Sequence, residues 1–125
     1  MKQLLVAFFL LAGTMCFAQS PIQFNTVKHD FGKIKKGIPA TYVFHFKNIG
    51  NKHVVIEVAT AECGCTTPEY PKAPIGKGKS GEIKVTYNAA LSGAFTKKVN
   101  VKLAGVNEPI VLTIEGIVED SGHSK

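Results

Sequence analysis

The stretch Thr41-Tyr-Val-Phe-His-Phe-Lys-Asn48 alternates clearly between apolar and polar side chains. In an extended chain, Tyr42, Phe44 and Phe46 fall on one side, and the residues between them fall on the other. This period of two predicts a β-strand with one face in a hydrophobic core. Turn-forming residues follow at Ile49-Gly50-Asn51-Lys52, so we expect the strand to end there.

Similar short alternating runs, separated by turn residues, continue in both directions from this strand. We expect strand character at 22–24, 27–31, 54–58, 81–87, 95–103 and 109–118, and no helical periodicity occurs after the first 18 residues. The stretch 61–80 predicts an irregular connection, because three prolines in seven residues forbid a central strand. The pattern therefore predicts an all-β fold, an antiparallel two-sheet sandwich of about seven strands.

The inward faces of these strands supply a plausible core of aromatic and branched side chains. The predicted core residues are Tyr42, Phe44, Phe46, Val54, Ile56, Val58, Ile83, Val85, Tyr87, Phe95, Val99, Val101, Leu103, Ile110, Leu112 and Ile114. No Trp lies between paired cysteines, so the cross-sheet disulfide pattern of antibody domains is absent.

The first 18 residues have the pattern of a cleaved export signal. A short positive start precedes the apolar run 4–12, and small residues at Cys16 and Ala18 occupy the positions that a signal peptidase reads. The apolar run is shorter than the roughly 20 residues of a membrane span. We therefore expect a signal peptide at 1–18, no integral membrane span after processing, and a periplasmic or extracellular location.

Processing leaves one small domain and a short tail. We expect the sandwich to occupy 19–118, followed by a polar tail at 119–125. Cys16 offers a lipid-anchoring alternative, which Met15 disfavours because small residues normally precede a lipidated cysteine.

The charge is basic, with a formal net charge of +6, and all 15 basic residues are Lys. Arg is the usual residue for bidentate recognition of phosphate and guanine, so its absence argues against sequence-specific nucleic-acid binding. The densest cluster, Lys33-Ile34-Lys35-Lys36, is short and is typical of a protected strand edge or turn.

Several motifs together resemble a known bacterial family. They are His29-Asp30-Phe31-Gly32, the run Phe44 to Gly50, Cys63-Gly64-Cys65-Thr66, the segment Gly81 to Tyr87, and Leu112 to Gly116. Their order and spacing resemble domain-of-unknown-function family 1573, which is common in exported proteins of Bacteroidetes. The resemblance implies an immunoglobulin-like fold similar to the ASH, MSP and hydin group, and no established enzymatic activity. Members of that wider group are mostly binding modules.

Cys63 and Cys65 are the only cysteines of the mature chain, and three interpretations stay open for them. They can form a structural pair, including a small-ring disulfide that Gly64 would help to close. They can bind a soft metal such as Cu(I), or Zn(II) if other ligands join, with His29, His45 and His53 as candidates. They can also form a redox-active pair, although no helix N-terminus is expected beside them.

Motifs of enzymes are missing from the chain. There is no Gly-x-Ser-x-Gly elbow, no phosphate-binding glycine loop and no His-Glu-x-x-His. The adjacent His29 and Asp30 point to opposite faces of a strand, so they do not form a catalytic dyad. We expect no enzymatic activity and no cofactor.

The leading functional hypothesis is a protein-interaction module of the cell envelope that holds an envelope protein or peptide segment. The expected contact zone is the proline-rich stretch 62–79, with Thr66, Thr67 and Pro68 as candidate contact residues. The alternative is a periplasmic copper-binding or thiol-redox protein that uses Cys63 and Cys65.

Overall fold

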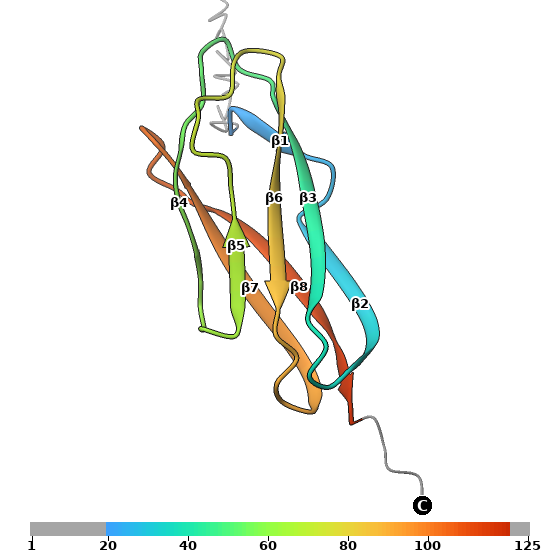
Figure 1. Cartoon of the computed structure of the whole chain (residues 1–125). Helices are drawn as coiled ribbons and strands as arrows, with labels where there is room; N and C mark the ends of the chain where they lie inside the picture. Colours follow the sequence, from blue (N-terminus) through green and yellow to red (C-terminus); the bar gives the residue numbers. More distant parts are fainter. Residues whose placement is uncertain (1–19, 121–125) are drawn as a thin grey trace, which may run out of the picture.

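A computed structural model describes residues 20–120 of the protein. This part of the chain folds into two four-stranded β-sheets (Figure 1). Sheet A has the strand order β1-β3-β6-β5, and sheet B has the order β2-β8-β7-β4. The strands are β1 (Ile22–Phe24), β2 (Lys28–Lys35), β3 (Ala40–Asn48), β4 (Ile56–Ala61), β5 (Thr66–Glu69), β6 (Ser80–Tyr87), β7 (Gly93–Leu103) and β8 (Ile110–Glu119). The predicted signal peptide at 1–18 and most of the predicted tail lie outside the described residues.

The immunoglobulin-like sandwich predicted from the alternating pattern is confirmed, with two differences. The described chain has eight strands rather than about seven, because Thr66–Glu69 forms a short strand inside the stretch expected to be irregular. Pro68 fits there because β5 is an edge strand, where a missing N–H need not break the ladder. The second difference is that β2 pairs with β8 in parallel, so sheet B is mixed rather than antiparallel.

The core between the sheets contains most of the predicted residues, including Phe44, Ile83 and Val101, which are fully buried. Val58 is the clear exception, since it is 37% exposed. A register shift between Ile56 and Val58 places one extra residue in β4, and from there on the opposite set of side chains faces inward. Ala59 is therefore buried in place of Val58. Tyr42 and Ile110 are half-buried and pack against the core.

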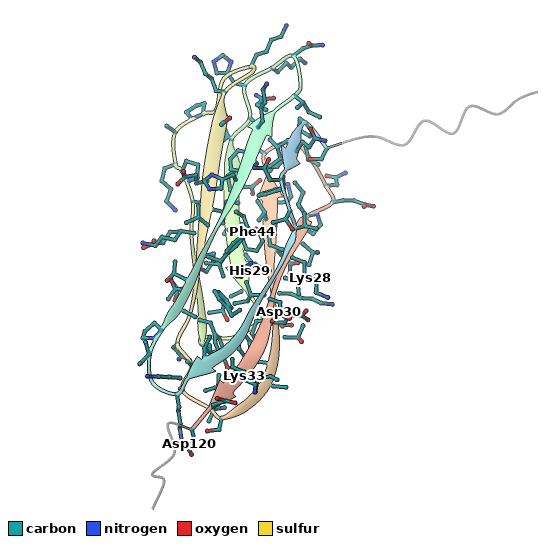
Figure 2. The ribbon with its side chains drawn as sticks, turned by 90° about the vertical axis from the view of Figure 1, so that its right-hand side faces the viewer. Lys28, His29, Asp30, Lys33, Phe44 and Asp120 are labelled. Atoms are coloured by element: carbon teal, nitrogen blue, oxygen red, sulfur yellow. A yellow bond between two sulfur atoms is a disulfide. The ribbon has the colours of Figure 1, made fainter. Side chains whose placement is uncertain are left out.

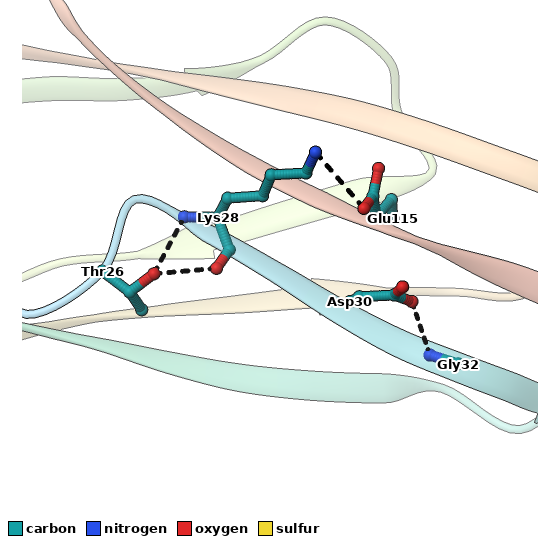
Figure 3. Close-up of polar contacts among 5 residues, drawn as sticks. All are labelled: Thr26, Lys28, Asp30, Gly32 and Glu115. Atoms are coloured by element: carbon teal, nitrogen blue, oxygen red, sulfur yellow. Dashed lines mark hydrogen bonds and ion pairs between the residues drawn. The ribbon is translucent and has the colours of Figure 1, made fainter.

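A bulge in β2 fits closely against β8. The register of the two strands shifts between Asp30 and Lys33, where Asp30 Oδ1 accepts a hydrogen bond of 2.7 Å from the Gly32 N–H (Figure 3). Gly32 has a φ of +69°, a conformation that favours glycine. A Cβ on Gly116 of β8 would lie 2.9 Å from the Gly32 carbonyl oxygen, so this close approach requires glycine at Gly116 as well.

Polar contacts on the outer side fix the start of β2. The Thr26 hydroxyl donates to the Lys28 carbonyl at 2.9 Å and accepts from the Lys28 N–H at 3.3 Å (Figure 3). Lys28 Nζ also lies 3.4 Å from Glu115 Oε1 on β8. These contacts hold β2 in sheet B after the chain has crossed over from β1 in sheet A.

Asn48 is the last residue of β3 and is only 1% exposed. Its Nδ2 donates to the carbonyl oxygens of Lys52 (2.8 Å) and Ile75 (2.9 Å), and its Oδ1 accepts from the Gly50 N–H (3.0 Å). The sequence pattern predicts only the end of a strand here, whereas Asn48 is a buried anchor for three backbone groups. Residues 20–120 contain no apolar helix of membrane-spanning length.

Candidate functional site

The candidate site is the turn between β4 and β5, which connects an edge strand of sheet B to an edge strand of sheet A. Cys63 and Cys65 lie in this turn and are joined by a disulfide, with their Cα atoms 5.3 Å apart. That separation lies within the usual range for disulfides. Both cysteines are half-buried, and Gly64 between them is exposed. The turn therefore presents a disulfide at the surface, at one long side of the sandwich (Figure 1).

Gly64 plays a different part from the one expected from the sequence. The glycines with a positive φ among the described residues are Gly32, Gly37, Gly78, Gly93 and Gly105, and Gly64 is not one of them. A Cβ at Gly64 would also meet no atom within 4 Å. The disulfide therefore closes the three-residue loop 63–65 without the left-handed backbone conformation that only glycine readily adopts.

The disulfide can contribute little to the stability of the fold. A cross-link stabilises mainly by restricting the unfolded chain, and the effect falls as the closed loop becomes shorter. For a loop of three residues the loop-entropy relation gives about 1.6 kcal/mol, against about 3 kcal/mol for fifteen residues. Cys63 and Cys65 are also held near each other by β4 and β5, so the bond joins residues that the fold already brings together.

Thr66, which the sequence predicts as a partner-contact residue, is buried beside the disulfide. It is only 4% exposed, and its hydroxyl oxygen lies 3.6 Å from Cys65 Sγ and 3.8 Å from Cys63 Sγ. A hydroxyl is both a donor and an acceptor, so Thr66 presents a buried donor to both sulfur atoms. The sequence signal was the threonine directly after the second cysteine, but its inward orientation depends on the pairing of β5 with β6.

The other two predicted contact residues, Thr67 and Pro68, point their backbone N–H and C=O positions to opposite sides of β5. The Asn88 N–H donates to the Cys65 carbonyl at 2.9 Å, and Thr67 lies opposite Thr86 two residues further on. The backbone of Thr67 therefore faces β6, and that of Pro68 faces the free edge of sheet A. The Thr67 side chain is exposed on the outer face of the sheet. Pro68 has no N–H, so it removes a donor from this edge.

The edge of sheet B on the same side, β4, is less protected. Glu62 N donates to the Lys98 carbonyl at 3.3 Å, and Thr60 lies opposite Asn100 two residues earlier. In an antiparallel ladder the residues between these pairs turn their N–H and C=O groups the other way. Ala59 and Ala61 thus point their backbone groups away from β7. Within residues 20–120, β5 lies close to β4, but the other side of β4 pairs with no strand after the bridge between Val54 and Ile75.

The three candidate histidines lie in separate places. The His29 ring stacks on the Tyr42 ring with centroids 3.7 Å apart, and it points into the sandwich between β2 and β3 (Figure 2). His45 Nδ1 lies 3.5 Å from Glu82 Oε1 on the outer face of sheet A, and His53 lies in the turn before Val54. Among residues 20–120 no three metal-ligating side chains form a cluster. Metal binding by the reduced cysteines stays a prediction.

Two surface pockets are candidate sites for small molecules. One, of about 320 Å³, is lined by residues that include Pro21, His53, Val54 and Leu103. The other, of about 430 Å³, lies over the β2 bulge beside Gly116 and is open to solvent. Neither lining brings together a nucleophile, a base and a group that orients the base, the set that nucleophilic catalysis uses.

Comparison with protein families finds one match, to the family described as protein of unknown function (DUF1573), over residues 22–118. This confirms the resemblance found in the sequence motifs. No curated protein sequence matches the chain.

Among solved structures, a protein of unknown function from Porphyromonas gingivalis W83 is similar with a TM-score of 0.67 and 11% identity, over 81% of this chain and 50% of that one. This chain thus spans half the length of that protein. The ASH/PapD-like domain 7 of human CEP192 gives a TM-score of 0.70 with 8% identity, over 86% of this chain and 93% of that one.

The VesB protease of Vibrio cholerae gives a TM-score of 0.62 with 12% identity, over 78% of this chain but only 32% of the protease. At these identities the three similarities show a shared fold and nothing further.

Proposed function

This chain belongs to the family described as protein of unknown function (DUF1573), and from its fold we propose that it is an exported, non-catalytic interaction module of the cell envelope. It binds an extended segment of another envelope protein, which adds a strand to sheet B beside β4. Immunoglobulin-like sandwiches bind extended peptides in this way because their sheet edges present unpaired backbone groups.

The observation that carries the proposal is the edge of β4, whose outward backbone groups pair with no strand of residues 20–120. Ala59 and Ala61 offer two N–H donors and two C=O acceptors, which match the alternating groups of an added strand. Residues 59–61 contain neither proline nor lysine, the residues that most often protect an edge. Val58 adds an exposed apolar side chain at the start of this stretch.

The remaining edges are better protected against an added strand. On β5, Pro68 lacks the donor that the edge position would need. On β2, a bulge and the side chains of Lys28, Lys33 and Lys35 interrupt the edge. β1 has only three residues, and the part of β3 that it leaves unpaired begins directly after Pro39, beside Lys35 at the end of β2 and Lys36 in the connection. β4 is therefore the edge that we assign to the partner.

Export and lack of catalysis are supported by separate observations. The pattern of residues 1–18 is typical of a cleaved signal peptide, and an exported location favours a stable disulfide between Cys63 and Cys65. The titratable side chains in residues 20–120 lie mostly on the outer faces of the sheets, in pairs such as Lys102 with Glu57 at 3.5 Å. Such pairs are typical of a solvated surface.

The test compares capture of partner protein from an envelope extract by the wild-type chain and by Ala61→Pro. The Ala61 N–H points away from β7, so proline removes an outward donor and leaves the ladder intact. We expect capture to be lost in Ala61→Pro and kept in Thr67→Val, which changes an exposed side chain on the neighbouring strand.

Hydrogen exchange of the captured complex provides the second part of the test. We expect the amides of Ala59 and Ala61 to become protected, while those of Thr41 and Val43 on the uncovered part of β3 stay unchanged. Protection of Thr41 and Val43 instead, or undiminished capture by Ala61→Pro, would contradict binding at β4.

A further inference from the structure

We propose that the Cys63–Cys65 disulfide is a site of thiol–disulfide exchange with a dithiol of a partner protein, in which Cys63 is attacked and Cys65 is the leaving group. The proposal does not depend on strand addition at β4. It starts from the observation that this disulfide is accessible and closes too short a loop to act mainly as a stabiliser.

The surroundings of the two sulfur atoms distinguish their roles. Cys65 packs against the hydrophobic core, and its carbonyl oxygen is tied into sheet A by the Asn88 N–H at 2.9 Å. Cys63 is not among the residues that pack on the core, and it lies on the β4 side of the turn, next to the exposed Glu62. An incoming thiolate therefore reaches Cys63 Sγ more easily than Cys65 Sγ.

The buried hydroxyl of Thr66 favours Cys65 as the leaving group. Disulfide exchange becomes faster when the departing sulfur is better stabilised as a thiolate. Thr66 Oγ1 lies 3.6 Å from Cys65 Sγ, the nearer of the two sulfurs, and can turn its O–H toward the negative charge that forms there. Because Thr66 is shielded from water, its donor is held ready for the sulfur rather than for solvent.

The exchange balances without any further reagent. A partner thiolate forms a bond to Cys63 Sγ, the Cys63–Cys65 bond breaks, and its electron pair remains on Cys65 as a thiolate. The second thiolate of the partner then attacks the partner's own sulfur in the mixed disulfide and releases Cys63 as a thiolate. The partner dithiol is oxidised to a disulfide, and its two protons pass through solvent to Cys63 and Cys65, which are reduced.

The first experiment uses dithiothreitol on the purified chain, with acid quenching, alkylation and mass spectrometry as the measure of reduction. We expect complete reduction under native conditions, and a fold that persists by circular dichroism. Thr66→Val should slow the reduction about tenfold, as expected for loss of one hydrogen bond to a charged group. Thr67→Val is the matched control and should react like wild type, and Thr66→Ser should restore the rate.

The second experiment compares access to the two sulfur atoms, with oxidised glutathione as the probe. In Cys65→Ser the remaining Cys63 should form the mixed disulfide about ten times faster than the remaining Cys65 does in Cys63→Ser, because of its greater access. Equal rates, or a faster Cys65, would overturn the assignment. Resistance of the native disulfide to dithiothreitol, or equal rates for Thr66→Val and Thr67→Val, would overturn the proposal itself. Both cysteine variants keep β4 intact, so failure here is separate from failure of Ala61→Pro.

Discussion

On the β2–β3 side of the sandwich, aromatic rings fill the space between the sheets, whereas on the β4–β5 side the chain passes from one sheet to the other through an exposed disulfide turn. His29 stacks on Tyr42 and meets the Phe31 ring edge-on at 4.8 Å, so three rings close the first side. Lys28 and Asp30 project outward beside them (Figure 2). The second side leaves backbone groups of β4 unpaired and holds two half-buried cysteines.

Under the proposed function, the sandwich has its closest packing on one side and its binding edge on the other. The β2–β3 side depends on close contacts that tolerate no added atoms, such as the approach of Gly32 to Gly116. The β4–β5 side contains Gly64, which has open space around it. Substitutions on the two sides should therefore have unequal effects on the free energy of unfolding.

The largest effect is expected for Gly116→Val. Its side chain would meet the Gly32 carbonyl oxygen and the buried Phe95 ring, both at 2.9 Å from the first added carbon. Overpacking at such a site should lower the free energy of unfolding by about 3 kcal/mol, measured by urea denaturation. Gly64→Val on the other side is the control and should cost less than about 1 kcal/mol. Equal costs would remove the contrast between the sides.

Proline substitutions at neighbouring positions test the direction of the β4 backbone. The Thr60 N–H faces Asn100, so Thr60→Pro removes a ladder hydrogen bond and should destabilise the fold by about 2.5 kcal/mol. The Ala61 N–H faces outward, so Ala61→Pro should cost less than about 1 kcal/mol. Thermal unfolding of both variants measures the difference, and the reverse order would mean that the open groups of β4 are misassigned.

Loss of the ring stack on the closed side should have an intermediate effect. His29→Ala removes the stack with Tyr42 and the edge contact with Phe31, at a cost of about 2 kcal/mol in the free energy of unfolding. His45→Ala provides the matched control, because His45 is exposed and should change stability by less than about 0.5 kcal/mol. A cost for His29→Ala no larger than for His45→Ala would show that the rings do not seal this side.

The smallest effect is expected from opening the disulfide on the other side. The double variant Cys63→Ser, Cys65→Ser should lose at most about 1.6 kcal/mol, since the closed loop has three residues. Calorimetry of the variant against the oxidised wild-type chain measures the loss. A cost above that of His29→Ala would assign the disulfide a structural role.

The strands with strict alternation could be predicted from sequence, and those shaped by contacts could not. Every second residue is buried from Phe44 to Asn48 in β3 and from Ile83 to Tyr87 in β6, so their faces follow from the period of two. In β4 the bulge after Ile56 reverses the faces, and nothing in the local pattern marks it. The parallel pairing of β2 depends on the chain crossing between sheets, which alternation does not encode.

The sequence indicates where the candidate site lies in the chain, but it does not predict how the side chains of the site contact one another. Cys63 and Cys65 stand out in the sequence as a pair and Thr66 as a candidate contact residue, whereas the inward turn of the Thr66 hydroxyl arises from the register of β5 on β6. The sequence predicts Pro68 as a contact residue. Only the pairing of β5 with β6 shows that Pro68 removes a hydrogen-bond donor from the free edge of sheet A.

The parallel pairing of β2 with β8 also has a mechanical consequence. β2 begins near the start of the described chain and β8 ends it, and the two strands run in the same direction over six paired positions. A force that pulls the two ends apart therefore slides one strand along the other and loads their hydrogen bonds together, rather than opening them one by one. The domain should therefore resist a force applied at its two ends better than a domain whose terminal strands open one hydrogen bond at a time.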